Sequence, residues 1–166
     1  LFDLDLVNRN LVRRVARQRP QLQVATLDLD AKIIESHKRE AKPSYKGMTG
    51  YQPLLGVWAE LGMVLGDEFR DGNVRAAQGL RRFYQRLRRR LPSQVQRVRL
   101  RSDSAGYEHE LIGQLVEDGV EFTISADMSE QLRAACAALP PEEWAPLDED
   151  DHAVRTWAEI VYVPDV

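Results

Sequence analysis

Three aspartates stand at the ends of two apolar, strand-like segments, where carboxylates could bind a metal and act on phosphates. Asp28 and Asp30 occupy alternate positions in QVATLDLDAKII, so a strand directs both to one face, roughly 6.6 Å apart along its axis. Asp103 lies just past the alternating segment VQRVRLR. An aspartate in an apolar strand is costly unless it is paired, hydrogen-bonded or bound to a cation. The pattern fits a site for a hard cation such as Mg²⁺, although by spacing alone helix caps or salt-bridge partners are the commoner explanation.

Basic residues are concentrated in the middle of the chain. The 166 residues carry a formal net charge of −3 and are 43% hydrophobic, which excludes a disordered chain and fits one ordinary domain. Residues 72–102 hold ten arginines and no acid, whereas residues 103–166 hold 16 acids and two arginines. The arginine block favours contact with a polyanion, with a solvated helix and strand face as the alternative. The candidate DNA-binding residues are Arg81, Arg82, Arg86, Arg97, Arg99 and Arg101.

Apolar periodicity predicts the elements that would position these residues. Helices are expected at 8–18, 74–91, the later part of 102–119, and 128–139. Strands are expected at 23–34, 51–61, 63–70, 95–101, 120–126 and 157–163. The polar segments 36–50 and 140–151 are interpreted as an extended loop and an exposed connection.

This order predicts an α/β fold with a mixed sheet, three antiparallel strands followed by parallel strands, and helices on both faces. The ribonuclease-H-like architecture has such an order. Its first strand is central, the hairpin lies on one side, and the strand after the first helix returns on the other. That adjacency would bring Asp30 and Asp103 to neighbouring strand ends. We divide the chain into an N-terminal helical segment, 1–19, and a core, 20–166.

Several longer segments resemble the catalytic domain of bacterial insertion-sequence transposases of the DDE class. They are TLDLDAKIIESHKREAKPSYKGMTGYQPLLGVWAE, DEFRDGNV, RLRSDSAGYEHELI and EFTISADMS, and the resemblance runs from about Val24 to Val163. It implies a ribonuclease-H-like fold and an enzyme that uses Mg²⁺, or Mn²⁺ in its place, to cleave DNA and transfer the freed strand. It also implies that Asp30 and Asp103 are the catalytic metal ligands. We expect Asp28 to support them from the same face, more deeply buried and hydrogen-bonded.

The chain departs from that family in two ways. The third acid of the family is a downstream glutamate, for which no counterpart is found before Val166, so we expect a core truncated before that acid and an inactive fragment. Lys32 stands where the family commonly has threonine or serine; it could pair with Asp30, contact phosphate or mark a decayed copy. Three other acids near the site are interpreted as structural, namely Glu110, Asp127 and Glu159.

Two other functions fit the same residues: a DNA-binding remnant without catalysis, and a ribonuclease-H-like nuclease that cuts but does not join. The partner expected from the resemblance is double-stranded DNA, both transposon ends and target, on which the protein could form a homo-oligomer. No apolar run approaches the ~20 residues of a membrane span. The expected location is the bacterial cytoplasm, in association with the nucleoid. The single Cys136 excludes a disulfide framework within the chain and a cysteine-based zinc site.

Overall fold

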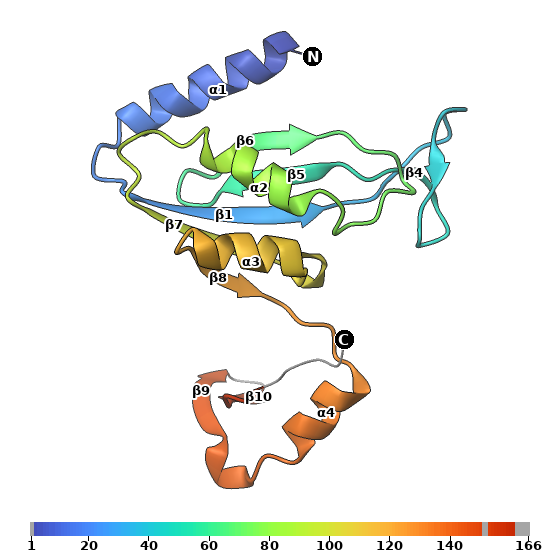
Figure 1. The fold of residues 1–166 in the computed structure, drawn as a ribbon, viewed down its shortest axis with the longest axis vertical. Coiled ribbons are helices and arrows are strands. Elements are labelled where there is room, and N and C mark those ends of the chain that lie inside the picture. The colour runs from blue at the N-terminus through green and yellow to red at the C-terminus, as the bar shows by residue number, and fades with distance from the viewer. Residues whose placement is uncertain (1, 151–152, 162–166) are drawn as a thin grey trace. The chain divides into compact units, whose positions relative to one another are not determined.

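The computed structural model describes residues 2–150 and 153–161, which form two compact units, Leu1–Ala126 and Asp127–Val166 (Figure 1). The division therefore falls at residue 126, whereas the sequence had suggested a boundary at residue 19. None of the described helices is both long and apolar enough to cross a membrane.

The first unit is built on a five-stranded mixed sheet with the order β6-β5-β1-β7-β8. The central strand, β1, pairs antiparallel with β5 and parallel with β7, and β7 pairs parallel with β8. The predicted ribonuclease-H-like sheet is thus confirmed. Because β5 is antiparallel to both β1 and β6, all strands except β5 end at the same edge. The strands are β1 (Val24–Ala31), β5 (Leu54–Trp58), β6 (Met63–Glu68), β7 (Arg97–Ser102) and β8 (Glu121–Ile124).

Alternation along β1 separates a buried face of the sheet from a charged one. Ala25, Leu27 and Leu29 are almost fully buried and share a core with α2 (Leu80–Arg88) and α3 (His109–Glu117). Both helices lie in front of the sheet in Figure 1. The intervening side chains of β1 point to the opposite face, which puts Asp28 and Asp30 on that face.

Two glycines decide how α2 meets the sheet. A Cβ on Gly56 of β5 would lie 2.2 Å from Cδ1 of Leu87, so any larger residue there would displace the Leu87 side chain of α2. Gly79 has φ +81° and forms the N-cap of α2. The helix therefore begins at Leu80, later than the predicted residue 74, and the preceding residues form turns.

Helix α1 (Phe2–Arg17) belongs to the first unit and begins earlier than predicted. Its Val12 and Ala16 are buried in the common core. Asn8 donates a hydrogen bond of 2.9 Å to the carbonyl of Val64 in the edge strand β6. These contacts join α1 to the sheet of the first unit.

The predicted loop 36–50 is partly wrong, because it contains two strands of a small antiparallel sheet with the order β2-β4-β3. These strands are only two or three residues long, too short to produce a periodic sequence pattern. Gly50 is required where β4 passes β2, since a Cβ would lie 2.1 Å from the carbonyl oxygen of Ile34. The strands are β2 (Ile34–Glu35), β3 (Lys42–Pro43) and β4 (Thr49–Tyr51).

The second unit contains α4 (Glu130–Ala137) and an antiparallel pair, β9 (Ala145–Asp150) and β10 (Ala153–Trp157). Ser129 caps the N-terminus of α4, since its Oγ accepts a hydrogen bond from the amide of Leu132 at 3.1 Å. The predicted exposed connection 140–151 is wrong in its second part, which forms β9, and the predicted strand 157–163 is wrong for residues 158–161. The acidic stretch becomes a strand because it pairs across to residues 153–157, with Arg155 opposite Asp148. Residues 158–161 have no regular structure, and residues 151, 162 and 163 lie outside the described residues.

Candidate active site

Asp30 and Asp103 occupy equivalent positions at the ends of two neighbouring parallel strands. The pairing of β1 with β7 runs to Leu29 opposite Ser102, and the two aspartates are the next residues. Neighbouring strands lie roughly 4.8 Å apart, so both carboxylates belong to one small region of the sheet edge. Both residues are exposed, and Asp30 makes no hydrogen bond or ion pair with any described residue. Its carboxylate is therefore available to an external cation.

A tight turn holds Asp103 in place. Its Oδ1 accepts a hydrogen bond of 3.1 Å from the amide of Ala105 and caps the short 3₁₀ helix Ser104–Gly106. The turn requires Gly106, because a Cβ at that position would lie 2.6 Å from Cβ and Oγ of Ser102. The motif SDSAG thus fixes the backbone that follows β7, and Asp103 has a structural role beside any role in metal binding.

Asp28 forms an ion pair with Arg101 on the neighbouring strand β7. Its two carboxylate oxygens accept hydrogen bonds from Arg101, 2.6 Å from Nε to Oδ1 and 2.7 Å from Nη2 to Oδ2. The hydrogen bond and the charge of Asp28 raise the pKa of the Arg101 guanidinium. Asp28 is partly buried and lies on the face that carries Asp30. This arrangement gives it a bidentate ion pair and leaves it less available to a metal than Asp30.

Thr26 and Glu60 extend the polar face of β1, a contact that the sequence did not indicate. Glu60 accepts hydrogen bonds from the Thr26 amide at 2.8 Å and from the Thr26 hydroxyl at 2.6 Å. Partial burial acts to raise the pKa of Glu60, but these hydrogen bonds outweigh it and the pKa is lowered. The only sequence signal was the alternation of Thr26, Asp28 and Asp30, which marks one polar face of an apolar strand.

The lysine and the substitute acids lie apart from these contacts. Lys32 is exposed, and no ion pair joins it to Asp30 in the part of the chain that the structure describes. Glu110 pairs with Arg81 at 3.5 Å on the surface of the first unit. Asp127 and Glu159 belong to the second unit. Among residues 2–150 and 153–161, no group of three or more His, Cys, Asp or Glu could hold a metal ion.

Two carboxylates at adjoining strand ends suit a hard cation that keeps water or phosphate oxygens in the rest of its coordination sphere. One of them, Asp30, has no protein partner among the described residues, which is the state expected of a ligand group. Asp30 and Asp103 thus fit part of a magnesium site and could bind the ion from one side.

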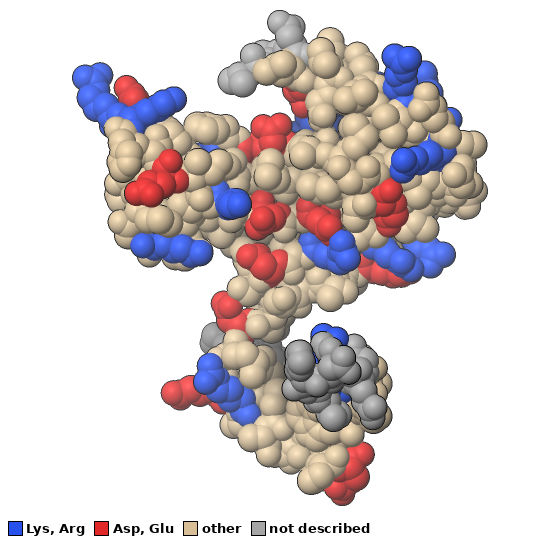
Figure 2. Space-filling view, turned by 180° about the vertical axis from the view of Figure 1, so that it is seen from behind, with Lys and Arg blue, Asp and Glu red and all other residues tan. Residues whose placement is uncertain are grey.

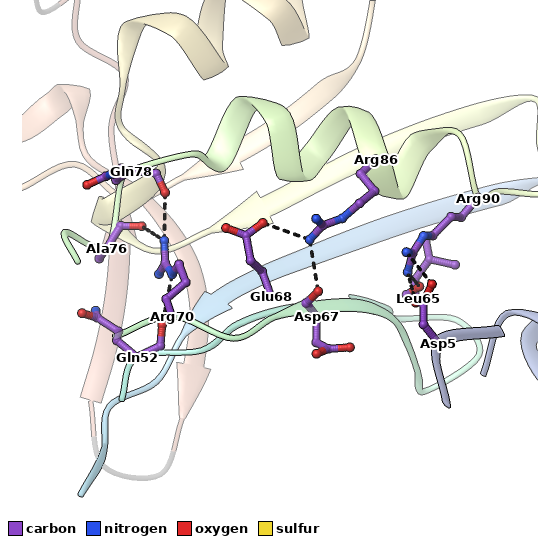
Figure 3. A network of polar contacts seen from close by, with 10 residues as sticks. All are labelled: Asp5, Gln52, Leu65, Asp67, Glu68, Arg70, Ala76, Gln78, Arg86 and Arg90. Atoms are coloured by element: carbon purple, nitrogen blue, oxygen red, sulfur yellow. Dashed lines mark hydrogen bonds and ion pairs between the residues drawn. The ribbon is translucent and has the colours of Figure 1, made fainter. Parts of the chain in front are cut away.

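Five of the six predicted DNA-binding arginines are paired with acids of this chain. Arg97 and Arg99 both contact Glu121, at 3.5 and 2.8 Å. Arg81, Arg86 and Arg101 also have acidic partners, and Figure 3 shows Arg86 bonded to Glu68. Arg82 is exposed and pairs with no described residue. Figure 2 shows basic and acidic side chains interspersed on the face of the first unit that is turned away from the viewer in Figure 1.

Arg70 is a buried cation that sequence reasoning missed. It is 6% exposed, and its Nε and Nη1 donate to the carbonyls of Gln52 and Gln78 at 3.0 and 2.8 Å (Figure 3). Burial lowers the pKa of Arg70, and the charge of Glu68 acts in the opposite direction. Arg70 therefore ties the start of β5 to the turn before α2.

Comparison with known proteins defines the class of this domain. Residues 3–164 match the family model described as Transposase DDE domain group 1, which is nearly the whole chain, so the protein belongs to that family. No curated protein matches. The family membership confirms the resemblance seen in the sequence.

Three solved structures are similar to this chain at low identity. The catalytic domain of Mos1 mariner transposase is 16% identical with a TM-score of 0.47, over 75% of this chain and 61% of that one. The piggyBac transposase synaptic complex with hairpin DNA is 12% identical with a TM-score of 0.43, over 64% and 24%. The HTLV-2 integrase catalytic core domain in complex with magnesium is 13% identical with a TM-score of 0.39, over 70% and 76%. The chain thus spans less than two thirds of the two transposase chains.

Proposed function

We propose that this domain takes part in the metal-dependent cleavage of DNA and the transfer of the freed strand during transposition of an insertion sequence. Membership of the DDE family supports the class of reaction. The observation that carries the proposal is the position of Asp30 and Asp103, each directly after the paired residues Leu29 and Ser102 of neighbouring strands. Two carboxylates are thereby available at one edge of the sheet, with an exposed approach for DNA.

Asp30 and Asp103 would hold Mg²⁺, with Mn²⁺ as a substitute. The bound metal would supply Lewis-acid stabilisation of phosphate oxygens and a more acidic water or hydroxyl nucleophile. Asp28 would set the position of β7 relative to β1 through its pair with Arg101. The tight turn at Gly106 would keep the Asp103 carboxylate at the strand end. A third carboxylate, as the family resemblance implies, would complete the site.

The partner we propose is double-stranded DNA, at transposon ends and at the target. Arginines of α2 and β7 would contact phosphates, an interaction that is independent of sequence and weakens with salt. The exposed Arg82 lacks an acidic partner among the described residues, which favours α2 over the more neutralised β7. Assembly as a homo-oligomer on DNA and action at the bacterial nucleoid in the cytoplasm are parts of the same proposal.

The decisive experiment is a strand-transfer assay on the protein expressed from its complete reading frame, with labelled terminal DNA and Mg²⁺ or Mn²⁺. Asp30→Asn and Asp103→Asn should each abolish both cleavage and joining. Asp67→Asn, which changes an exposed aspartate on β6, is the matched control and should retain activity.

The same assay separates the alternatives. Cleavage without joining would indicate a nuclease of the same fold. DNA binding with no cleavage by the complete protein would indicate a remnant without catalysis. Activity that survives both Asp30→Asn and Asp103→Asn would overturn the proposed site.

A further inference from the structure

A pocket of about 870 Å³ opens beside the beginning of α2. It is lined by the end of β6 and the connection that follows, by the first turns of α2, and by two acids near the start of α3. Strand β6 ends at the same edge of the sheet as β1 and β7, since β5 is antiparallel to both β1 and β6. The pocket thus lies at the end of the sheet that carries Asp30 and Asp103.

The lining of the pocket contains more cationic than anionic groups. Arg81 and Arg86 are paired with Glu110 and Glu68. Arg75 and Arg82 are exposed and have no acidic partner among the residues that the structure describes. The third acid of the lining, Glu108, has no cationic partner among the described residues and accepts hydrogen bonds from the amides of Glu110 and Leu111. Its charge offsets one of the two free arginines, so the exposed side chains leave the pocket with a small excess of positive charge.

Arg70 adds a fixed positive charge at the wall of this pocket. It is 6% exposed and lines the pocket, and its Nη2 has no hydrogen-bond partner in the described structure. The rest of its guanidinium is held by three backbone carbonyls, and Figure 3 shows it directed towards the Ala76–Gln78 segment. A buried cation without an ion pair is costly, and an anion bound nearby would offset that cost.

The N-terminus of α2 also attracts an anion to this pocket. Its N-cap is Gly79, no side chain caps it, and its first turn contains no acid. The amide of Leu80 already donates to the carbonyl of Ala77, whereas the next amides of the first turn lack helical partners, and the helix dipole favours an anion beside them. Arg81 and Arg82 belong to this turn, so backbone and side-chain donors are available at one place.

An aromatic ring stands at the opening of the pocket. Phe69 lines the pocket and is 67% exposed, which is unusual for a large apolar side chain in a folded unit. Its ring lies 4.7 Å from that of Tyr51, between centroids, and this contact supports the ring from one side. The exposed ring can accept a flat partner, and every nucleic-acid base has a suitable face.

We propose that this pocket binds one unpaired nucleotide of a DNA strand. The phosphate contacts Arg82, Arg75 and the first turn of α2, and the base stacks on Phe69. This inference rests on the proposed function, because the inference says which form of DNA reaches the sheet edge that carries Asp30 and Asp103. A fully paired duplex keeps its bases stacked inside the helix, so it can use the arginines but not the ring.

The test compares two DNA ligands by fluorescence anisotropy with the whole protein. One is a blunt duplex, and the other is the same duplex with a three-nucleotide single-stranded overhang. The wild-type protein should bind the overhang duplex at least about fivefold more tightly, as stacking of one base provides. Phe69→Ala should remove that preference and leave blunt-duplex affinity unchanged, whereas Phe69→Trp should keep it. Tyr45→Ala, which removes a ring that is 72% exposed outside the pocket, is the matched control and should also keep it.

Two further measurements complete the test. Competition with a free nucleotide identifies the source of the phosphate, and thermal melting shows whether the variants are folded. Free deoxyadenosine monophosphate should compete poorly; competition equal to that of the overhang duplex would assign the pocket to a free nucleotide and overturn the inference. Equal affinity for blunt and overhang duplexes would overturn the inference and leave the proposed function intact. Failure to bind either DNA would overturn both. Thermal melting should be the same for Phe69→Ala and Phe69→Trp, since the ring is exposed.

Discussion

Asp28 and Arg101 face each other across β1 and β7 and are joined by two short hydrogen bonds, of 2.6 and 2.7 Å. Asp30, two residues further along the same face, has no such partner among the described residues. Two aspartates of one strand therefore differ in what they can bind. Asp28 is neutralised by a neighbouring guanidinium, whereas Asp30 keeps its negative charge at the sheet edge beside Asp103.

We expect Asp30→Asn and Asp103→Asn to abolish Mn²⁺ binding, because each removes a ligand. Asp28→Asn should weaken binding about tenfold at most, the lower part of the range for groups that support a ligand. Isothermal titration with Mn²⁺ measures the three affinities. A greater loss for Asp28→Asn than for Asp30→Asn would show that Asp28 is the ligand.

The sheet could be predicted because each of its main strands has a recognisable pattern within its own short segment of sequence. Strict alternation marks β7, and the apolar run with two aspartates marks β1. The strand order then follows from the order of elements along the chain, and it places Asp30 beside Asp103. The helix expected in the later part of 102–119 ends in the same local way, since Gly119 has φ +63° directly after the C-cap of α3.

The remaining features depend on contacts between residues far apart in the sequence. In the sequence, nothing distinguishes Arg70 from a surface arginine. In the fold it is buried and donates hydrogen bonds to the carbonyls of Gln52 and Gln78. The acidic partners of the arginine block come from other segments, such as Glu121 on β8. An acid-free stretch of sequence therefore does not produce a surface without acids. The contact of Glu60 with Thr26 also joins two segments, and no sequence spacing predicts it.

Replacing Lys32 should strengthen metal binding. The lysine follows Asp30 by two residues and is exposed, so its ammonium repels a cation at the sheet edge through solvent. Removal of one such charge should improve Mn²⁺ affinity about two- to fivefold at low ionic strength, with a smaller gain in high salt. Titration of Lys32→Gln measures this gain, and Lys46→Gln, an exposed lysine in the turn between β3 and β4, is the control. An unchanged or lower affinity for Lys32→Gln would mean that the lysine lies away from the metal.

Arg82 of α2 and Arg75 in the segment before α2 should contribute more to DNA binding than the arginines of β7. Glu121 already neutralises part of the charge of Arg97 and Arg99. The double variant Arg75→Ala/Arg82→Ala should reduce the slope of log affinity against log salt by about two, or roughly 0.9 per lost phosphate contact. Arg97→Ala/Arg99→Ala should reduce it by less than one. Anisotropy titrations at several salt concentrations give both slopes, and the reverse ranking would place the DNA on the β7 face.

Acid should destabilise the domain partly through Glu60. Its folded pKa lies below its ordinary value of 4.5, so the stability that it contributes is complete above that value and is lost as the pH falls through the folded pKa. Glu60→Gln should cost about 1 kcal/mol at pH 7, less than the roughly 1.5–3 kcal/mol of a hydrogen bond to a charged group, because solvent screens the exposed Glu60. The difference from wild type should shrink below pH 4.5. Urea unfolding at several pH values measures it, with Glu40→Gln as an exposed control; a difference that is independent of pH would contradict the assignment.

The 166-residue chain alone should bind Mg²⁺ weakly and should not cut DNA. Metal-assisted phosphoryl transfer needs enough negative charge to hold the ions while charge develops on the attacking and leaving oxygens. Asp30 and Asp103 supply two charges, and Lys32 lies nearby in sequence and reduces their effect. Mg²⁺ also gives up its waters reluctantly, so two carboxylates on one side hold it loosely. The purified chain, incubated with Mn²⁺ and labelled duplex DNA, should therefore leave the duplex intact. Nicking that is lost in Asp30→Ala or Asp103→Ala would show that a third acid of this chain completes the site, and Glu110→Gln, Asp127→Asn and Glu159→Gln would then identify it.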